Sequence, residues 1–251
     1  MIYIISKGAS GLAEKIVITS GKGGVGKTTC CVAIGDELAS RGYSVLLVDT
    51  DVGLRSIDEL LHMSQRIVYD WGDMILGRCK GEDAVVVSSE NLDLLTCPLQ
   101  YDDAFTPENL KKVIEEFDAD YDFILIDSPA GIDIGFENAA AAADRAIVVS
   151  TSDSVCVRSA ARAGDKLYDM GINDVRLIIN RFRKKSVINR KFLNIDDVID
   201  KTMIQLIGVV PEDEELTFGS IMEKRTQASF SPFVRIVNRI LKKEEKLILN
   251  F

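Results

Sequence analysis

Short hydrophobic runs recur along the chain and alternate with segments in which apolar residues have helical spacing. Each run is apolar throughout rather than at every second position, a pattern typical of strands buried on both faces of a parallel sheet. The chain contains seven such runs: KIVITS (15–20), SVLLVD (44–49), LDLLTC (92–97), DFILID (122–127), RAIVVS (145–150), VRLIIN (175–180) and QLIGVV (205–210). The pattern therefore predicts a mostly parallel, twisted sheet.

The segments between the runs predict helices. Residues 28–42, TTCCVAIGDELASRG, have apolar positions at helical spacing and end at a glycine, a common helix stop. Alternation of strands and helices predicts a sheet with helices on both faces, the three-layer, Rossmann-like α/β class. Near the carboxyl terminus, five apolar residues at i, i+3, i+4, i+7 and i+8 predict one more helix packed on the core. These are Phe233, Ile236, Val237, Ile240 and Leu241.

No Pro-, Ser- or Gly-rich linker, internal repeat or low-complexity tract divides the chain, so we expect one domain over residues 15–245. Residues 1–14 have too short an apolar stretch for a signal peptide and lack a basic start. We expect an edge strand or a loose leader there. Residues 246–251 are expected to form a short apolar tail, and no run approaches the length of a membrane span.

The overall charge and the cysteines narrow the functional classes. The 251 residues include 39 acidic and 30 basic side chains, which give a formal net charge of −9. Proteins that bind the phosphate backbone of nucleic acids usually have a positive surface, so the negative net charge leads us to expect no nucleic-acid partner. The five cysteines form no C-x-x-C pair and His62 is the single histidine, which disfavours zinc and indicates reduced thiols in the cytoplasm.

One glycine-rich stretch carries a specific chemical signal. Residues 20–28 read SGKGGVGKT and directly follow the first apolar run, which satisfies the G-x-x-x-x-G-K-[ST] motif. Glycines let successive backbone N–H groups face one anion, and the following helix adds its positive N-terminal end. Lys27 is expected to reach the β- and γ-phosphates, and the Thr28 hydroxyl to bind Mg²⁺. The expected nucleotide-binding residues of this loop are Gly23, Gly24, Val25, Gly26, Lys27, Thr28 and Thr29.

Carboxylates follow two other apolar runs: Asp49 and Asp51 after the second, and Asp127 after the fourth. Ligands bind beyond the carboxyl ends of parallel strands, so we expect these side chains near the phosphate loop. One carboxylate of the Asp49–Asp51 pair can approach the metal while the other faces a water near the γ-phosphate, and Asp127 is expected to hold Mg²⁺ through a water. The candidate metal-binding residues are Thr28, Asp51 and Asp127. Gly131 would let a backbone amide approach that phosphate. Without the phosphate loop, an acidic turn or a helix cap would be the simpler interpretation of the Asp49–Asp51 pair.

Polar residues after the last two runs suit a base pocket. Asn180 and Arg181 follow VRLIIN, and Pro211 and Glu212 follow QLIGVV. An amide can donate to and accept from the N6/N7 edge of adenine at once, and a proline offers a flat apolar face and a carbonyl. The alternative that these residues merely form the turns that end the two strands is nearly as good an interpretation.

Several segments together resemble the MinD/ParA family of deviant Walker A P-loop ATPases over about residues 15–213. They are KGGVGKTT (22–29), VLLVDTDVGLRSID (45–58), IVYD (67–70), ILIDSPAGID (124–133), INRF (179–182) and GVVPEDE (208–214). DVGLRSID, DSPAGI and the P-E-D turn favour the MinD branch of that family. The resemblance implies a P-loop NTPase fold, with ATP and Mg²⁺ as ligands.

The resemblance also implies roles for single residues. Lys22 matches the signature lysine that reaches the phosphates of a nucleotide in the facing subunit, so that ATP is buried between two protomers. A lysine supplied in trans then acts as an arginine finger does. Asp51 would orient the attacking water, Asp127 and Thr28 would serve Mg²⁺, and Asn180 and Pro211 would flank adenine. We therefore count Lys22, Lys27 and Asp51 as catalytic.

The implied function is an ATP-dependent homodimeric switch that recruits division-site regulators to the inner membrane surface, with a division inhibitor or topological factor as partner. A flagellar or pilus placement ATPase and a DNA-partitioning ATPase of the same family are the alternatives. An iron–sulfur carrier on this fold would need cysteines across a dimer axis or a C-terminal C-x-x-C. The protein is expected to be cytoplasmic and to lie peripherally on the inner face of the cell membrane when it binds there.

Three segments depart from the family pattern. Relatives usually carry an acidic S-V-R-D-x-D-R stretch on the surface that binds partners, whereas residues 156–162 of this chain read CVRSAAR. After the P-E-D turn, relatives usually carry a loop of small residues with Asn and Gly, whereas residues 216–225 read LTFGSIMEKR. The chain ends at Phe251, about where relatives begin a linker and an amphipathic membrane helix. Residues 232–251 carry five basic and two acidic side chains, a local charge of +3 that anionic lipid attracts. The tail could therefore make weak membrane contact, and a tail docked on the protein itself is the alternative.

Overall fold

The structure is a computed structural model, and it describes residues 11–183, 192–212 and 231–243. Eight strands form one sheet in the order β3-β4-β2-β5-β1-β6-β7-β8, and all neighbouring pairs are parallel except β3 with β4. The strands are β1 Glu14–Thr19, β2 Val45–Asp49, β3 Val85–Ser89, β4 Leu92–Leu95, β5 Phe123–Asp127, β6 Arg145–Ser150, β7 Val175–Phe182 and β8 Gln205–Pro211. The predicted mostly parallel sheet is confirmed.

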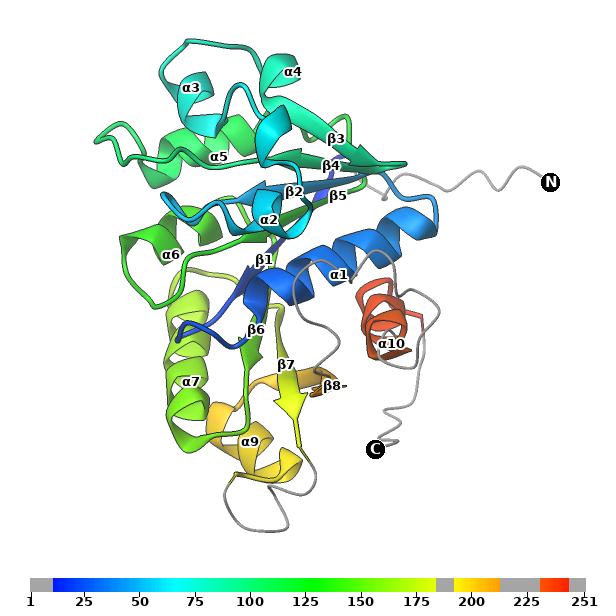
Figure 1. Ribbon diagram of the computed structural model, residues 1–251. Helices are drawn as coiled ribbons and strands as arrows, with labels where there is room; N and C mark the ends of the chain where they lie inside the picture. The colour runs from blue at the N-terminus through cyan, green and yellow to red at the C-terminus, as the bar shows by residue number, and fades with distance from the viewer. Residues whose placement is uncertain (1–10, 184–191, 213–230, 244–251) are drawn as a thin grey trace, which may run out of the picture.

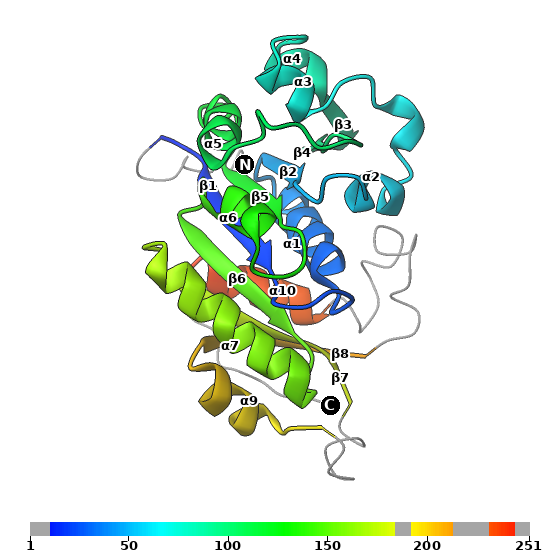
Figure 2. The same cartoon turned by 90° about the vertical axis from the view of Figure 1, so that its left-hand side faces the viewer.

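Helices cover both faces of the sheet (Figures 1 and 2). On one face α1 and α10 pack over the centre and the β8 end, while α5, α6, α7 and α9 cover the other face. Each face has its own cluster of buried apolar side chains, as the three-layer prediction requires. The helical segments are α1 Lys27–Ser40, α2 Ser56–Leu60, η1 Ser64–Arg66, α3 Trp71–Ile75, α4 Gly81–Ala84, α5 Pro107–Glu115, α6 Ile134–Ala140, α7 Ser154–Asp169, α9 Ile195–Thr202 and α10 Ser231–Ile240.

All seven apolar runs form strands, but the sequence pattern missed β3. This strand pairs antiparallel with β4 through a turn in which Asn91 has a φ of 62°. Its residues are only partly buried, because it lies at the edge of the sheet. An edge strand needs no long apolar run, and the three valines 85–87 were too few to stand out.

The predicted C-terminal helix is α10, and Phe233, Ile236, Val237 and Ile240 are buried against the core as expected. The fifth predicted residue, Leu241, follows the end of the helix and is only partly buried against the same core. At the other end, β1 begins at Glu14, one residue before the predicted domain start, and it lies in the centre of the sheet. Residues 1–10, the loop at 216–225 and the tail at 246–251 lie outside the described residues. Among the described helices, none combines the length and the apolar character needed to cross a membrane.

The strand order brings the candidate residues together. β1 lies between β5 and β6, and β2 lies beside β5, so the loops after β1, β2 and β5 meet at one edge. Asp49 and Asp127 are register partners on adjacent strands, and Asp127 is also aligned with Ile18 of β1. Residues more than 70 positions apart in the chain therefore share one site at the carboxyl end of the sheet.

Candidate nucleotide-binding site

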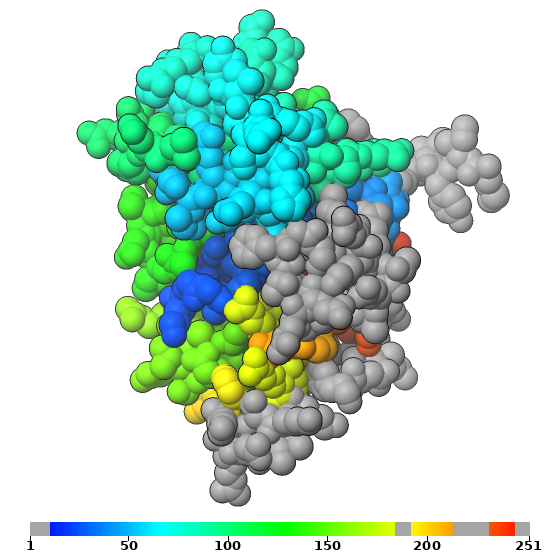
Figure 3. Space-filling view, in the orientation of Figure 1, coloured from blue at the N-terminus to red at the C-terminus, as the bar shows by residue number. Residues whose placement is uncertain are grey.

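The phosphate loop runs from Ser20 to the first turn of α1, where Lys27, Thr28 and Thr29 begin the helix. Gly24 has a φ of 78° and Gly26, which precedes α1, a φ of 89°. L residues with side chains rarely adopt this left-handed region, so glycine is required where the loop turns its amides toward a bound anion. In Figure 3 the dark blue segment that contains this loop is exposed between the cyan segment around α2 and the yellow end of β7.

Lys27, Thr28 and Asp127 form the centre of the site. The Thr28 hydroxyl donates to Asp127 Oδ2 at 2.6 Å, and the Lys27 ammonium lies 3.5 Å from Asp127 Oδ1. Lys27 is 8% exposed and Asp127 is fully buried. Burial raises the pKa of Asp127, while the charge of Lys27 and the hydrogen bond from Thr28 oppose that shift. The structure thus brings together the three residues that the sequence assigned to phosphate and Mg²⁺.

The two carboxylates after β2 have different surroundings. Asp49 is buried and accepts hydrogen bonds from the amides of Asp51 at 2.9 Å and Ile57 at 3.0 Å. Burial and the nearby charge of Asp127 raise the pKa of Asp49. Asp51 is half-buried at the rim, and burial raises its pKa while Lys27 opposes the shift. Asp49 therefore shapes the loop, and Asp51 is the carboxylate available to a ligand.

The residues present fit a magnesium-bound nucleotide. Asp127 Oδ1 is buried and, in the part of the chain that the structure describes, accepts no hydrogen bond, although the Lys27 ammonium lies 3.5 Å from it. Buried carboxylate oxygens are normally satisfied, so this atom is suited to a metal-bound water. Mg²⁺ usually keeps several waters and takes only one or two protein ligands in addition to phosphate oxygens. Thr28, at the start of α1, and Asp127, at the end of β5, match that requirement.

Lys22 projects from the loop and is exposed. Its carbonyl accepts a hydrogen bond from the Ser20 hydroxyl at 2.8 Å, which fixes the backbone beneath the side chain. Burial would raise the pKa of Asp153, but hydrogen bonds from Cys156 and Thr151, with the nearby charge of Lys22, hold it below its ordinary value. Lys22 thus lies near the beginning of α7 with its ammonium on the surface.

Two residues that were expected to contact the nucleotide also form hydrogen bonds within the protein. The Gly131 amide donates to the Ser20 carbonyl at 3.1 Å, and the approach of this amide to a γ-phosphate stays a prediction. The Asn180 amide nitrogen donates to the Val25 carbonyl at 2.8 Å, and Asn180 is buried. Both groups brace the phosphate loop, because a chain that presents its amides outward leaves carbonyls directed inward.

Arg181 also contacts the phosphate loop. It adopts a φ of 53°, and its guanidinium donates to the Gly24 carbonyl at 2.9 Å. Pro211 is aligned with Phe182, so the ends of β7 and β8 are adjacent as the predicted base pocket requires. The Glu212 amide donates to the Phe182 carbonyl, and its carboxylate pairs with Arg183. The flanking of adenine by Asn180 and Pro211 stays a prediction.

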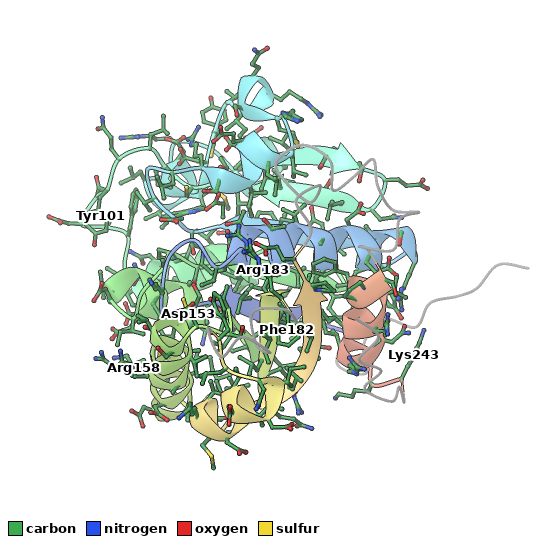
Figure 4. All side chains as sticks on the ribbon, turned by 60° about the horizontal axis from the view of Figure 1, so that its bottom comes forward. Tyr101, Asp153, Arg158, Phe182, Arg183 and Lys243 are labelled. Atoms are coloured by element: carbon green, nitrogen blue, oxygen red, sulfur yellow. The ribbon has the colours of Figure 1, made fainter. Side chains whose placement is uncertain are left out.

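A pocket of about 260 Å³ lies beside this pair of strand ends. Figure 4 labels two of its residues, Asp153 at the beginning of α7 and Arg183 just after β7. The sequence had indicated neither of them, nor Ser152. Each follows an apolar strand by one to three positions, so the rule that located Asp51 could have found them. The lining residues are Thr151, Ser152, Asp153, Arg181, Arg183, Phe192 and Glu212.

Known proteins share both the sequence and the architecture of this chain. Residues 13–163 match a family described as an AAA domain. The septum site-determining protein MinD of Bacillus subtilis is 39% identical over 241 residues, covering 92% of this chain and 90% of that protein.

Two solved structures are also similar. One is a chain of the MinC:MinD cell division protein complex of Aquifex aeolicus, with a TM-score of 0.85 and 34% identity, covering 94% of this chain and 99% of that chain. The other is the septum site-determining protein MinD of Pyrococcus horikoshii complexed with Mg-ADP, with a TM-score of 0.80 and 26% identity. That match covers 91% of this chain and 96% of that one.

Proposed function

This chain belongs to the MinD family of septum site-determining proteins, and we propose on that premise that it is a Mg-ATP-dependent ATPase and a dimerising switch. Its single ATPase domain would recruit division-site regulators, a division inhibitor among them, to the inner membrane surface. The Aquifex aeolicus relative in a MinC:MinD complex supports a partner of that kind, and family membership favours this role over flagellar placement or DNA partitioning. The Pyrococcus horikoshii relative, complexed with Mg-ADP, supports the choice of ligand.

One observation carries the proposal: Lys27 and Thr28 contact Asp127, with Lys27 and Asp127 buried, and the loop that carries Lys27 also carries an exposed lysine, Lys22. Lys27 and the loop amides bind the phosphates, and Thr28 and Asp127 hold Mg²⁺. When bound, Mg²⁺ neutralises charge that develops on the phosphates. Lys22 is free to reach the phosphates held by a second copy, which ties hydrolysis to the dimer.

Asp51 is the proposed water-orienting residue. It lies at the rim beside β2, is half-buried, and its carboxylate is not used by the loop in the way that the Asp49 carboxylate is. A group that orients water acts more on the transition state than on the bound ground state. Asp51 should therefore matter for turnover rather than for ATP affinity.

Sedimentation with a non-hydrolysable ATP analogue tests the trans role of Lys22. Asp51→Ala should form dimers, whereas Lys22→Ala should remain mostly monomeric although its phosphate loop is intact. Lys201→Ala, which removes an exposed lysine on α9, is the matched control and should dimerise as the wild type does. Equal dimer fractions for Lys22→Ala and Lys201→Ala would refute the trans contact.

We propose a cytoplasmic location with peripheral membrane contact in the ATP-bound dimer. The local positive charge of residues 232–251 supports attraction to anionic lipid. A single short tail binds weakly, but two tails held by one dimer bind together with a much higher effective concentration. ATP would then control membrane binding through dimerisation.

A further inference from the structure

The backbone that carries Asp51 is held on two sides. Asp49 accepts from the amides of Asp51 and Ile57, so one carboxylate fixes both ends of the loop between β2 and α2. On the other side, the Cys97 thiol donates to the Asp51 carbonyl oxygen at 3.2 Å. Cys97 is fully buried, and burial together with the charge of Asp49 raises its pKa, so the sulfur keeps the proton that it donates.

Arg55 connects this loop to a neighbouring segment. Its Nε donates to the Cys97 carbonyl at 2.7 Å, and its Nη2 donates to Asp70 Oδ2 at 2.7 Å. The backbone of Arg55 has φ 49° and ψ 49°, a left-handed conformation that costs energy for a residue with a side chain. The Arg55 and Asp70 side chains are 19% and 12% exposed, so solvent screens this ion pair less than a surface pair.

The segment that Arg55 contacts is itself anchored. Asp70 caps α3 through the Asp73 amide, and the two residues form a reciprocal capping box. The next residue, Trp71, is buried and donates from Nε1 to the Asp49 carbonyl at 2.8 Å. Its ring packs edge-on against Phe105 with centroids 4.8 Å apart. Arg55 therefore joins the Asp51 loop to a rigid support rather than to a mobile surface group.

We propose that Arg55 is a positioning residue for the hydrolysis reaction and acts by holding the Asp51 backbone through Cys97 and Asp70. Three observations support this assignment. The Arg55 guanidinium donates to two acceptors, the Cys97 carbonyl and the Asp70 carboxylate. The Cys97 thiol contacts the Asp51 carbonyl, and the Arg55 backbone is left-handed. It rests on the proposed role of Asp51 in turnover. Reacting groups displaced by about 1 Å can lose roughly a hundredfold in rate, which gives such a support its value.

The test compares Arg55→Lys with Arg78→Lys. Lysine keeps the charge near Asp70 but loses the planar fork that contacts Asp70 and the Cys97 carbonyl at once. Arg78 also pairs with an α3 aspartate, Asp73 at 3.2 Å, but its side chain is 64% exposed. Under single-turnover conditions we expect Arg55→Lys to slow hydrolysis roughly ten- to a hundredfold with unchanged ATP affinity. Arg78→Lys should hydrolyse ATP as the wild type does.

A second arm distinguishes positioning from general support. Placed in an Asp51→Ala background, Arg55→Lys should cause no further fall in the residual rate, because its effect passes through Asp51. Asp70→Asn keeps a capping side chain on α3 but removes the charge pair with Arg55, so this variant should also slow turnover. It serves as the test variant if Arg55→Lys does not fold. Wild-type rates in both variants, or an equal loss of ATP affinity, would overturn the proposal. A wild-type protein without ATPase activity would instead refute the proposed function itself.

Discussion

Replacing Gly26 with alanine tests how tightly the phosphate loop is packed on its support. Gly26 has a φ of 89°, and a Cβ added there would lie 2.3 Å from the Asn180 amide nitrogen. That nitrogen donates to the Val25 carbonyl at 2.8 Å, so it cannot move away without breaking a buried hydrogen bond. Gly24 is the matched control, because it has a similar φ of 78° but a Cβ added there would have no neighbouring atom within 4 Å.

The two variants share one cost and differ in another. A left-handed conformation costs an alanine about 1–2 kcal/mol, and this applies at both positions. Gly26→Ala also displaces Asn180 and leaves the Val25 carbonyl short of a partner, which adds about 1–3 kcal/mol. Because the entropy effect of alanine on the unfolded chain is common to both, it cancels in the comparison. The free energy of unfolding of Gly26→Ala should therefore be about 1–3 kcal/mol lower than that of Gly24→Ala.

Urea unfolding of the nucleotide-free protein, followed by circular dichroism, measures this difference. In an Asn180→Ala background the collision is removed, so Gly26→Ala should then cost no more than Gly24→Ala. Equal destabilisation by the two alanines in the wild-type background would refute the packing argument. So would a Gly26→Ala penalty that is unchanged when Asn180 is alanine.

Three further outcomes are expected. Lys27→Ala should abolish ATP binding in calorimetry, because enclosed phosphate charge would lack its counter-ion, and wild-type affinity would refute the loop assignment. Alkylation at pH 8 followed by mass spectrometry should label half-buried Cys79 before Cys30, whose pKa burial raises to about 12; equal labelling would contradict that burial. Pelleting with anionic vesicles should require ATP and fail when residues 246–251 are deleted, whereas nucleotide-independent pelleting would exclude the tail as the anchor.

Much of the fold follows from local pattern alone. Continuous apolar runs predicted seven strands, and each of them forms a strand, because burial on both faces demands apolar side chains at every position. The edge strand β3 was missed for the same reason, since an edge position relaxes that demand. The spacing of Phe233, Ile236, Val237 and Ile240 likewise predicted the buried face of α10.

The candidate site divides along the same line. The chemistry of Lys27, Thr28 and Asp127 was legible in the sequence, because their residue types and their positions after apolar runs are local properties. The hydrogen bonds of Asn180, Gly131 and Arg181 to the phosphate loop were not, and all three residues had been expected to bind the nucleotide. Whether an amide faces a ligand or a backbone carbonyl depends on neighbours that the local sequence does not specify.

The sequence by itself determined which elements form and which residue types end the strands. Only the tertiary structure decided that β2, β5 and β1 lie side by side, which brings Asp49, Asp127 and the phosphate loop into contact. It also decided that Arg55, inconspicuous within DVGLRSID, spans the Cys97 carbonyl and the Asp70 carboxylate. The physical reason is that strand order and side-chain partners depend on packing between segments far apart in the chain, whereas periodicity and turn chemistry act over a few residues.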